Sequence, residues 1–465
     1  MPRYGSMSSK APFILLVNPW ITDFAAFDLW GKPMGLLLLG ALLREGGCRV
    51  ELLDCLDRHD GPTAARQDVF PGSDRMYGTG KYPRMVIPKP AAYAGIPRRY
   101  HRYGIHPESF RAKLQAMPRP DIIWVTSVMT YWYPGLQETI TLLKEIHPEV
   151  PVWLGGIYAG LCRKHARERS GADEIVVLPP ERLPERIEAA TGFMLENCRH
   201  WGSFRHWPPP ALDLLASLPY APLLTSTGCP FRCPYCASHL LQPRWEKRSA
   251  AFIYEEVLRC HERYGTLDFA LFDDALLLQA ESTLKPALER LCREGVKVRF
   301  HTPNALHIRA LTSEWCELLH ASGFTTIRLG LETTHPDRQR QWGGKVETAM
   351  FQDAVSRLRS AGFSRDQIGV YLLGGLPGQS PAEVAEAIRI VREAGAQPHL
   401  AEYSPLPGTS MWEEAMSASP YDVENEPLYH NNTFFACRRP DFTYEDLLHL
   451  KDLSKQARRP PPAPS

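Results

Sequence analysis

The chain has 465 residues, and its 53 Lys and Arg residues nearly balance its 52 Asp and Glu residues, which gives a formal net charge of +1 at pH 7. This length fits about two or three domains, and the balanced charge gives no overall attraction to nucleic acid or to anionic membranes. The longest apolar run, 35–43, is far shorter than the ~20 residues that cross a bilayer, and residues 1–10 lack the apolar core of a signal peptide. We therefore expect a cytoplasmic protein without a membrane span, whose 11 cysteines are mostly reduced.

The first half of the chain alternates short apolar runs with helical patterns. The predicted strands are continuous apolar stretches, typical of strands that are buried on both faces: 13–18, 48–54, 121–127, 151–154 and 174–178. Helical patterns separate several of them: 33–46, 135–146 and 159–169. This alternation predicts an α/β fold with an open, doubly wound parallel sheet of the Rossmann-like type. Ligands of such sheets bind beyond the carboxyl ends of the strands.

A long insertion, residues 58–120, interrupts this first domain. It is rich in Pro and Gly, and its Lys and Arg residues outnumber its Asp and Glu residues. Long irregular insertions in compact domains are usually functional or disordered, and the aromatic and apolar residues in 81–105 favour an ordered segment. We interpret it as a lid whose arginines grip a carboxylate or a phosphate. A solvated basic loop is the alternative, and a single basic loop on a neutral protein gives poor support for RNA binding.

The second half contains further strand and helix units. Residues 200–221 are Pro-rich and predict a stiff linker. Six strands are predicted after it: 222–227, 268–272, 297–301, 325–331, 369–373 and 399–403. Helical patterns lie between them: 250–264, 281–294, 312–321, 348–361 and 380–394. The pattern predicts a partial (β/α)6 barrel with its chemistry at the carboxyl ends of the strands.

The domain boundaries follow from these elements. The expected parts are a first domain (11–199), the linker (200–221), the barrel (222–410) and a C-terminal extension (411–465). The extension is expected to contain a helix over 444–457 and a disordered Pro-rich tail over 458–465.

Three cysteines directly follow the first predicted barrel strand, in the run Gly228-Cys-Pro-Phe-Arg-Cys-Pro-Tyr-Cys-Ala237. Its two prolines disfavour a regular helix, so a compact loop is expected. Thiolates at such short intervals bind an iron–sulfur cluster or zinc. A four-iron cluster that is held by Cys229, Cys233 and Cys236 leaves one iron without a protein ligand. The alternatives are a zinc site with His239 as fourth ligand and three unrelated core cysteines.

The cysteine run resembles the signature of the radical S-adenosylmethionine (SAM) enzymes, in which an aromatic residue, here Tyr235, precedes the last cysteine. The resemblance implies a [4Fe-4S] cluster whose open iron binds SAM, and reductive cleavage of SAM to a 5′-deoxyadenosyl radical. It also implies an external electron donor such as flavodoxin or ferredoxin. Six strand–helix units provide the structural context that the zinc alternative lacks.

The same resemblance implies a SAM site at the later strand ends, with no catalytic residue assigned beyond the cluster. The expected contacts are polar or glycine residues: Tyr235, Asp273, Asp274, Asn304, Arg328, Glu332, Gly374 and Gly375. The two aspartates offer acceptors for ribose hydroxyls or the methionine ammonium, although aspartate also serves as an ordinary helix N-cap. Arg328 and Glu332 share one face of their strand, and charges inside a barrel need a partner or a ligand. The glycine pair is expected near adenine.

The first domain resembles the cobalamin-binding domain that precedes many radical SAM domains. The matching residues lie at strand ends and at the start of the first helix: Asn18, Lys32, Pro33, Gly35, Ser127, Gly155 and Gly156. The usual Asp-x-His-x-x-Gly motif is missing, which argues against histidine as the lower ligand of cobalt. The aromatic run Tyr131–Tyr133 either covers the lower corrin face or packs between sheet and helix. A Gly-Gly pair after a strand is also common in tight turns.

Together the two resemblances imply a cobalamin-dependent radical SAM enzyme that methylates an unactivated carbon of a small metabolite. An alternative reaction is a rearrangement or ring formation without methyl transfer. A non-enzymatic alternative is a structural metal-binding or redox-sensing module. The substrate cannot be derived from the sequence.

Overall fold

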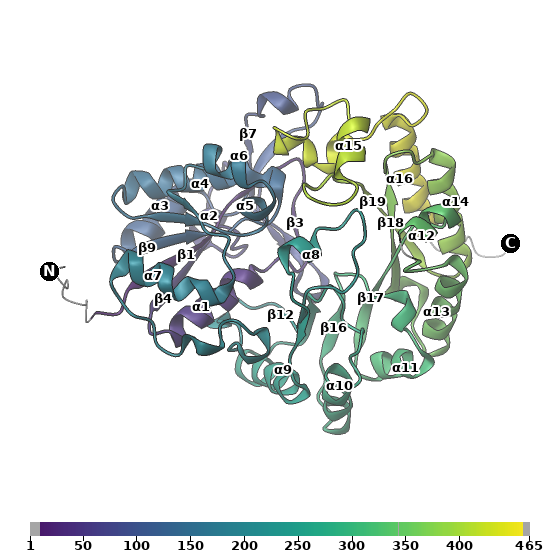
Figure 1. Cartoon of the computed structure of the whole chain (residues 1–465), viewed down its shortest axis with the longest axis horizontal. Helices are drawn as coiled ribbons and strands as arrows, with labels where there is room; N and C mark the ends of the chain where they lie inside the picture. Colours follow the sequence, from purple (N-terminus) through teal and green to yellow (C-terminus); the bar gives the residue numbers. More distant parts are fainter. Residues whose placement is uncertain (1–9, 343, 459–465) are drawn as a thin grey trace. The chain divides into compact units, whose positions relative to one another are not determined.

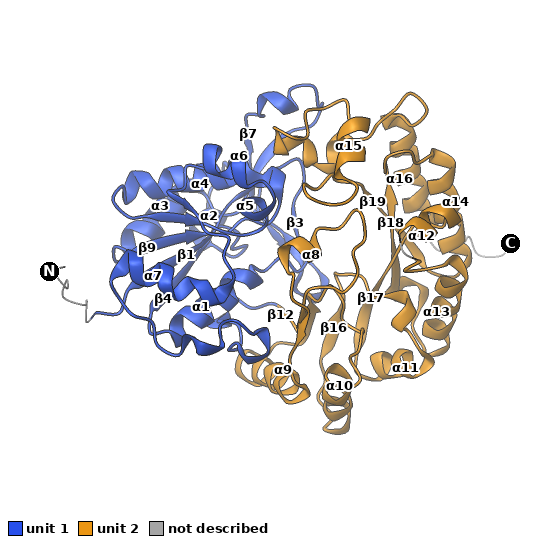
Figure 2. Cartoon of the chain, viewed as in Figure 1, with its two compact units in different colours: residues 1–219 blue, residues 220–465 orange. Residues whose placement is uncertain are grey.

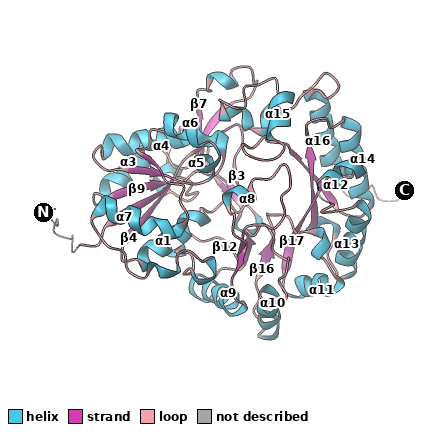
Figure 3. Ribbon diagram, viewed as in Figure 1, coloured by secondary structure: helices cyan, strands magenta, loops and turns pink. Residues whose placement is uncertain are grey.

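In the computed structural model, residues 10–342 and 344–458 are described. The chain divides after Pro219 into two compact units, unit 1 and unit 2 (Figure 2). Each unit has parallel strands with helices packed around them (Figures 1 and 3). Among the described residues, no helix combines the length and the apolar character needed to cross a membrane.

Unit 1 is built on a five-stranded sheet in the order β11-β10-β9-β1-β4, and all of its strand pairs are parallel. The strands are β1 (Phe13–Asn18), β4 (Arg49–Asp54), β9 (Ile122–Val125), β10 (Val152–Leu154) and β11 (Glu174–Ile175). Every residue of β1, β9 and β10 is buried, as their continuous apolar sequences require. The predicted open parallel sheet is confirmed.

Helices cover both faces of this sheet. One face packs against α1 (Met34–Glu45) and α7 (Leu183–Thr191). The other face packs against α3 (Pro107–Ala116), α4 (Tyr133–Ile146), α5 (Ile157–Leu161) and α6 (Arg163–Arg169). The helix predicted over 159–169 is two helices, because the backbone leaves the helical conformation at Cys162 (φ −114°, ψ 46°).

The basic insertion is ordered. It contributes β7 (Arg84–Ile87) and β8 (Tyr100–Tyr103) to an antiparallel sheet with β2 (Ile21–Asp23). It also contributes β5 (Ser73–Asp74) and β6 (Gly80–Lys81) to a second antiparallel sheet with β3 (Phe27–Asp28), and it includes the short helix α2 (Gly61–Ala64). The buried Arg58 donates hydrogen bonds to Asp28 and to the carbonyl of Gly78. These bonds tie the start of the insertion to β3 and to the turn before β6.

Most of the expected linker is folded onto unit 1. Trp201 is fully buried in the core of that unit. The amide of Ala211 donates to the carbonyl of Leu37, and Arg44 forms an ion pair with Asp213. The segment therefore extends the first unit and is not a free spacer.

Unit 2 contains a six-stranded sheet whose strands follow one another in chain order and whose neighbours are all parallel. The strands are β12 (Ala221–Leu223), β15 (Asp268–Leu271), β16 (Arg299–His301), β17 (Phe324–Glu332), β18 (Ile368–Gly374) and β19 (Gln397–Glu402). The helices between them are α9 (Ala250–Tyr264), α10 (Leu284–Arg293), α11 (Ser313–Ala321), α12 (Pro336–Gln341), α13 (Thr348–Ser360) and α14 (Pro381–Glu393). The predicted partial barrel is confirmed.

The C-terminal extension packs against this barrel. Helix α15 (Trp412–Ala418) shares a buried cluster with Leu376 and Tyr403. Helix α16 (Tyr444–Arg458) packs on β19 and α14. Arg458, expected in the disordered tail, ends this helix, and residues 459–465 lie outside the described residues.

Candidate functional site

The cysteine loop of unit 2 begins at a glycine that no other residue can replace without strain. Gly228 has φ +72°, and a Cβ there would lie 2.5 Å from the carbonyl oxygen of Arg244. Just before it, β13 (Ser226–Thr227) pairs with β14 (Glu246–Lys247), which closes the loop at its base. The short helix α8 (Ser238–Leu241) follows the cysteines. The loop is thus a closed excursion from the carboxyl end of the first barrel strand.

The three cysteines are close neighbours within this loop. The amide of Cys236 donates to the carbonyl of Cys233 (3.0 Å), and the Cys236 sulfur lies 3.3 Å from the hydroxyl of Ser238. Within the described chain, no three His, Cys, Asp or Glu side chains converge on one point as a single metal ion requires. A zinc ion bound with His239 would lie at about 2.3 Å from each sulfur, whereas a cluster binds each thiolate at a different iron.

Side chains from elsewhere in unit 2 surround the sulfurs. His307 Nε2 lies 3.8 Å from the Cys229 sulfur, and its ring contacts Phe231. Burial raises the pKa of Cys233, and the charge of Lys345 opposes this shift. Burial and the same lysine lower the pKa of His307 to about 3, so its imidazole is neutral. Neither His307 nor Lys345 is marked by any spacing in the sequence, and folding alone brings them to the loop.

Tyr235 is packed in the loop by two contacts. Its side chain forms a hydrogen bond with Cys233, and its ring lies edge-on to Trp342 at 5.1 Å. This places the predicted aromatic residue beside the sulfurs.

The aspartate pair after β15 divides into two roles. Asp273 is buried and accepts hydrogen bonds from the Thr225 amide (3.1 Å), the Thr225 hydroxyl (2.7 Å) and the Ser226 hydroxyl (2.6 Å). Burial raises the pKa of Asp273 to about 6, although these hydrogen bonds act to lower it. Asp274 instead forms a hydrogen bond with Ser238, next to the last cysteine, and burial raises its pKa. Asp273 thus holds the strand that leads to the cysteines, and its direct contact with SAM stays a prediction.

The end of β17 is strained. Glu332 has φ +66°, a region that non-glycine residues rarely adopt and that is concentrated at functional sites. Burial raises its pKa to about 7, and the charge of Lys345 opposes the shift. Besides burial, the charge of Glu332 also raises the pKa of Tyr235 and of Cys233, so Glu332 lies near the cysteine loop.

Arg328 does not join this group. Strand alternation predicts that it shares a face with Glu332, but its guanidinium forms a hydrogen bond with Tyr371 and donates to the carbonyl of Ile327. Arg328 and Glu332 therefore do not form an ion pair with each other, and the partners of Arg328 are Tyr371 and a backbone carbonyl.

The other predicted SAM residues have fixed local roles. Asn304 is exposed and donates to the carbonyl of Phe272 (2.7 Å). Gly375 has φ +87°, and its amide donates to Gln379 Oε1 (2.8 Å), as does the amide of the next residue. A Cβ at Gly374 would lie 3.0 Å from the side chain of Leu400. Their contacts with SAM stay predictions.

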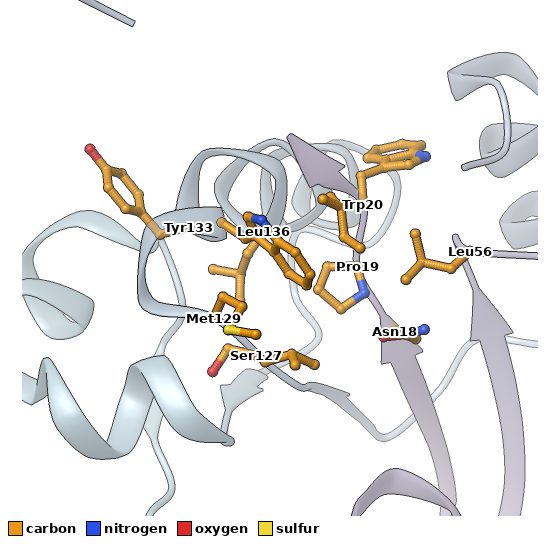
Figure 4. Close-up of a pocket in the computed structure, with 11 residues that line it drawn as sticks. Asn18, Pro19, Trp20, Leu56, Ser127, Met129, Tyr133 and Leu136 are labelled. Carbon is orange, nitrogen blue, oxygen red and sulfur yellow. The ribbon is translucent and has the colours of Figure 1, made fainter. Parts of the chain in front are cut away.

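Unit 1 has an apolar pocket at the carboxyl ends of β1 and β9 (Figure 4). The residues that line it come from the segments that follow these two strands and from the start of α4: Asn18, Pro19, Trp20, Ile21, Leu56, Ser127, Val128, Met129, Trp132, Tyr133 and Leu136. Asn18 and Leu56 stand opposite Ser127 and Met129 in Figure 4. None of these lining residues is a histidine. The lining is apolar apart from a few amide and hydroxyl groups, a character that suits contact with one face of an amide-bearing ligand such as a corrin.

The glycine pair after β10 lies directly against Ser127. The Ser127 hydroxyl donates to the carbonyl of Gly155 (2.8 Å). Gly156 has φ +89°, and a Cβ there would lie 2.3 Å from the Ser127 carbonyl oxygen. The structure thus brings together three of the predicted cobalamin residues at one point of the sheet edge.

The other predicted cobalamin residues form a second group. The side-chain amide of Asn18 donates to Asp54 (2.7 Å). Burial raises the pKa of Asp54, although the charge of Lys32 acts to lower it. Lys32 and Asp54 line a second pocket of unit 1. Pro33 is buried at the start of α1, while a Cβ at the exposed Gly35 would meet no atom within 4 Å.

Two residues of the aromatic run line the apolar pocket, and their contact with a corrin stays a prediction. Trp132 lines the apolar pocket and donates to Asp23 (2.8 Å). Tyr133 also lines the pocket, and its ring stacks on Tyr158 at 5.7 Å. The apolar residues Val128 and Met129 are each 41% exposed there. Sequence reasoning missed both, although large apolar residues in a loop after a strand are the available signal.

Comparison with known proteins identifies the barrel. A family model described as the radical SAM superfamily matches residues 223–391. The chain contains a radical SAM domain. The matched segment includes the cysteine loop and the strands that surround it, and the role of the three cysteines as cluster ligands stays a prediction.

Two curated proteins are similar to the chain. An uncharacterized methyltransferase of Pyrococcus horikoshii is 23% identical over 329 residues, which cover 64% of this chain and 70% of that protein. Cytidylyl-2-hydroxyethylphosphonate methyltransferase of Streptomyces wedmorensis is 25% identical over 487 residues, which cover 90% of this chain and 84% of that protein.

Solved structures of cobalamin-dependent radical SAM enzymes have the same fold. The radical SAM methyltransferase TsrM from Kitasatospora setae, solved with cobalamin and a [4Fe-4S] cluster, matches with a TM-score of 0.65 and 18% identity over 89% of this chain and 80% of that chain. The cobalamin-dependent SAM radical enzyme OxsB matches with a TM-score of 0.58 and 15% identity over 96% of this chain and 61% of that chain. Both matches extend beyond the radical SAM domain into unit 1.

Proposed function

We propose that this protein is a cobalamin-dependent radical SAM methyltransferase that methylates a carbon of a small molecule. The observation that carries the proposal is the combination, in one chain, of a three-cysteine loop at the carboxyl end of a barrel strand with an apolar pocket at the carboxyl edge of a parallel sheet. Both named relatives are methyltransferases. When bound, the cluster and SAM supply one-electron chemistry, and cobalamin supplies methyl transfer.

The residues of unit 2 have distinct parts in this function. Cys229, Cys233 and Cys236 would hold the [4Fe-4S] cluster. The SAM molecule would be bound by the polar and glycine residues at the strand ends: Tyr235, Asp274, Asn304, Glu332, Gly374 and Gly375. Asp273 fixes the base of the cysteine loop through its bonds to Thr225 and Ser226.

The residues of unit 1 would hold cobalamin. The apolar pocket supplies the surface for the corrin, and the glycines beside Ser127 leave room for close backbone approach. Lys32 and Asn18 add polar groups at the same sheet edge. Apolar walls also exclude water from reactive species.

The substrate is proposed to be a small molecule. One relative is named for cytidylyl-2-hydroxyethylphosphonate, and a TsrM structure was solved with a tryptophan substrate. A cytoplasmic location and a flavodoxin or ferredoxin as electron donor complete the proposal. All 11 cysteines are free of disulfide bonds, which suits a reducing compartment.

The test uses the full chain, reconstituted anaerobically with iron, sulfide and hydroxocobalamin. We expect reduced protein to convert SAM into 5′-deoxyadenosine, to retain corrinoid and to transfer a labelled SAM methyl group to product. Cys233→Ala should abolish 5′-deoxyadenosine formation, while Cys292→Ala, at an exposed cysteine outside the loop, should not. Turnover of substrate without label transfer would favour rearrangement or ring formation. A well-reduced wild-type protein that forms no 5′-deoxyadenosine would instead favour a structural or sensing module.

A further inference from the structure

Four polar side chains on the barrel wall of unit 2 are not explained by the SAM site. They are Arg328 on β17, Tyr371 on β18, His399 on β19 and Arg458 at the end of α16, and we call them the arginine cluster. The strands β17, β18 and β19 are neighbours in the sheet. The cluster is therefore one continuous patch, not a set of scattered residues.

The cluster is held by specific contacts. The Arg328 guanidinium forms a hydrogen bond with Tyr371, whose hydroxyl donates to the carbonyl of Pro303 (3.0 Å). Arg458 Nη1 lies 3.5 Å from His399 Nδ1. The rings of Tyr371 and His399 meet edge to face at 6.2 Å. Both arginines thus flank the same imidazole.

A glycine makes this convergence possible. Gly369 is the register partner of Arg328 on β18. A Cβ at Gly369 would lie 2.8 Å from Arg328 Nη1 and 2.9 Å from His399 Cδ2. The two side chains therefore meet over the space that a side chain at Gly369 would fill.

The charges of the cluster are not balanced by the protein. Neither guanidinium forms an ion pair with a carboxylate in the part of the chain that the structure describes. Burial, Arg328 and Arg458 lower the pKa of His399 to about 3, and its Nε2 is buried without a hydrogen-bond partner. Burying cationic groups without a partner costs free energy, and a bound anion would repay this cost.

The strand face connects the cluster with the cysteine loop. Arg328 and Gly330 lie on one face of β17, and the pairing of β17 with β18 is irregular between Gly330 and Glu332. The Glu332 carboxylate lies over Gly330, since a Cβ at that glycine would be 2.9 Å from Glu332 Oε1. Besides burial, the charge of Glu332 raises the pKa of Tyr371 in the cluster and also the pKa of Cys233 in the cysteine loop.

We propose that the arginine cluster binds an oxyanion of the small-molecule substrate, either a carboxylate or a phosphate-type group. This inference rests on the proposed function and replaces the SAM contact that the family resemblance implies for Arg328. Arg328 and Arg458 provide the planar, charge-assisted donors that such groups need. The rest of the substrate extends from the cluster towards the Glu332 carboxylate, which lies over Gly330, so the anionic group sets the distance between its anchor and the reacting carbon.

Calorimetric titration of the reconstituted full chain with sodium phosphate and with sodium acetate, against sodium chloride of equal ionic strength, tests the proposal. We expect saturable binding of at least one oxyanion by the wild type. Arg328→Gln should weaken it at least tenfold, and Arg458→Gln should weaken it as well. The matched control is Arg389→Gln, because Arg389 pairs with Glu386 and Glu393 on the exposed face of α14. Preference for phosphate or for acetate identifies the anionic group.

Three results would overturn the proposal. The first is wild-type protein that binds neither oxyanion. The second is Arg328→Gln and Arg458→Gln variants that melt like the wild type and bind equally well. The third is loss of oxyanion binding after saturation with S-adenosylhomocysteine, which would assign the cluster to the amino-acid carboxylate of SAM. Failure of the proposed function is a separate observation: protein that binds phosphate but forms no 5′-deoxyadenosine.

Discussion

The hydroxyl of Ser226 donates a 2.6 Å hydrogen bond to the carboxylate of Asp273, and this bond ties the strand before the cysteine loop to the end of β15. The amide and hydroxyl of Thr225 donate to the same carboxylate. The cluster ligands are therefore positioned by a buried acceptor that three donors share.

Replacement of Asp273 by Asn should loosen this loop. The amide has one acceptor oxygen and presents its NH2 group to groups that also donate, so at least one buried donor loses its partner. We expect a loss of about 2 kcal/mol in the free energy of unfolding and a clear fall in iron bound per chain after anaerobic reconstitution. Asp274→Asn is the control, because Asp274 does not bond to Thr225 or Ser226. Full iron loading in Asp273→Asn, with an unchanged melting temperature, would contradict this role.

Alanine at Gly156 should be far more disruptive than alanine at Gly192. Both glycines have positive φ (+89° and +69°). Gly192 lies in the left-handed region, where alanine costs about 1 kcal/mol, whereas Gly156, with ψ −167°, lies in a region that essentially only glycine adopts. Only at Gly156 does the new Cβ collide with the backbone of Ser127, whereas at Gly192 it meets no atom within 4 Å. We expect a loss of about 3 kcal/mol or more at Gly156, together with loss of corrinoid binding. Equal losses in denaturant titrations of the two variants would argue against the close approach.

Much of the fold could be predicted because its signals are local. Each barrel strand is a short apolar run, and each helix between strands shows helical periodicity, so element order and sheet type follow from pattern alone. The break at Cys162 and the folding of Trp201 onto unit 1 could not be predicted, because tertiary packing decides both. The order of the insertion could not be predicted either, because its strands pair with β2 and β3, and Arg58 bonds to Asp28, far away in the sequence.

The candidate site could be predicted from the sequence only where residues of one chemical type recur at a short, fixed spacing. The three cysteines are recognisable from their spacing. Lys345 and His307 reach the cysteine loop from other loops and carry no motif. Strand alternation in the sequence predicts that Arg328 and Glu332 share one face, but it does not predict which side chains on the neighbouring strands they contact. Arg328 finds Tyr371 because Gly369, on the adjacent strand, leaves space beside it.

Stability should depend on pH through Glu256, a buried carboxyl group on α9. Burial raises its pKa from 4.5 to about 7, although Arg259 and Arg248 oppose the shift. Because the folded pKa lies above the unfolded value, the folded state binds the proton more tightly, and stability falls as the pH rises from 4.5 through about 7. Between pH 5 and pH 8 we expect a loss of about 2–3 kcal/mol that Glu256→Gln lacks. Unfolding titrations of both proteins across this range measure the difference, and parallel pH profiles would show that Glu256 is ionised in the folded protein.

A charge at Met129 should expel the corrinoid without unfolding unit 1. Met129 is 41% exposed and lines the apolar pocket, while Met194 is 57% exposed in the same unit and does not line it. Both positions are open enough to solvent to accept glutamate with little change in stability. A carboxylate at position 129 would have to lose its hydration against an apolar corrin face, which is costly without a partner. We therefore expect Met129→Glu to lower retention of hydroxocobalamin at least tenfold in gel filtration followed by absorbance, and Met194→Glu to retain it like the wild type. Equal retention by all three proteins would place the corrinoid away from the loop after β9, and the apolar lining of this pocket would then serve packing alone.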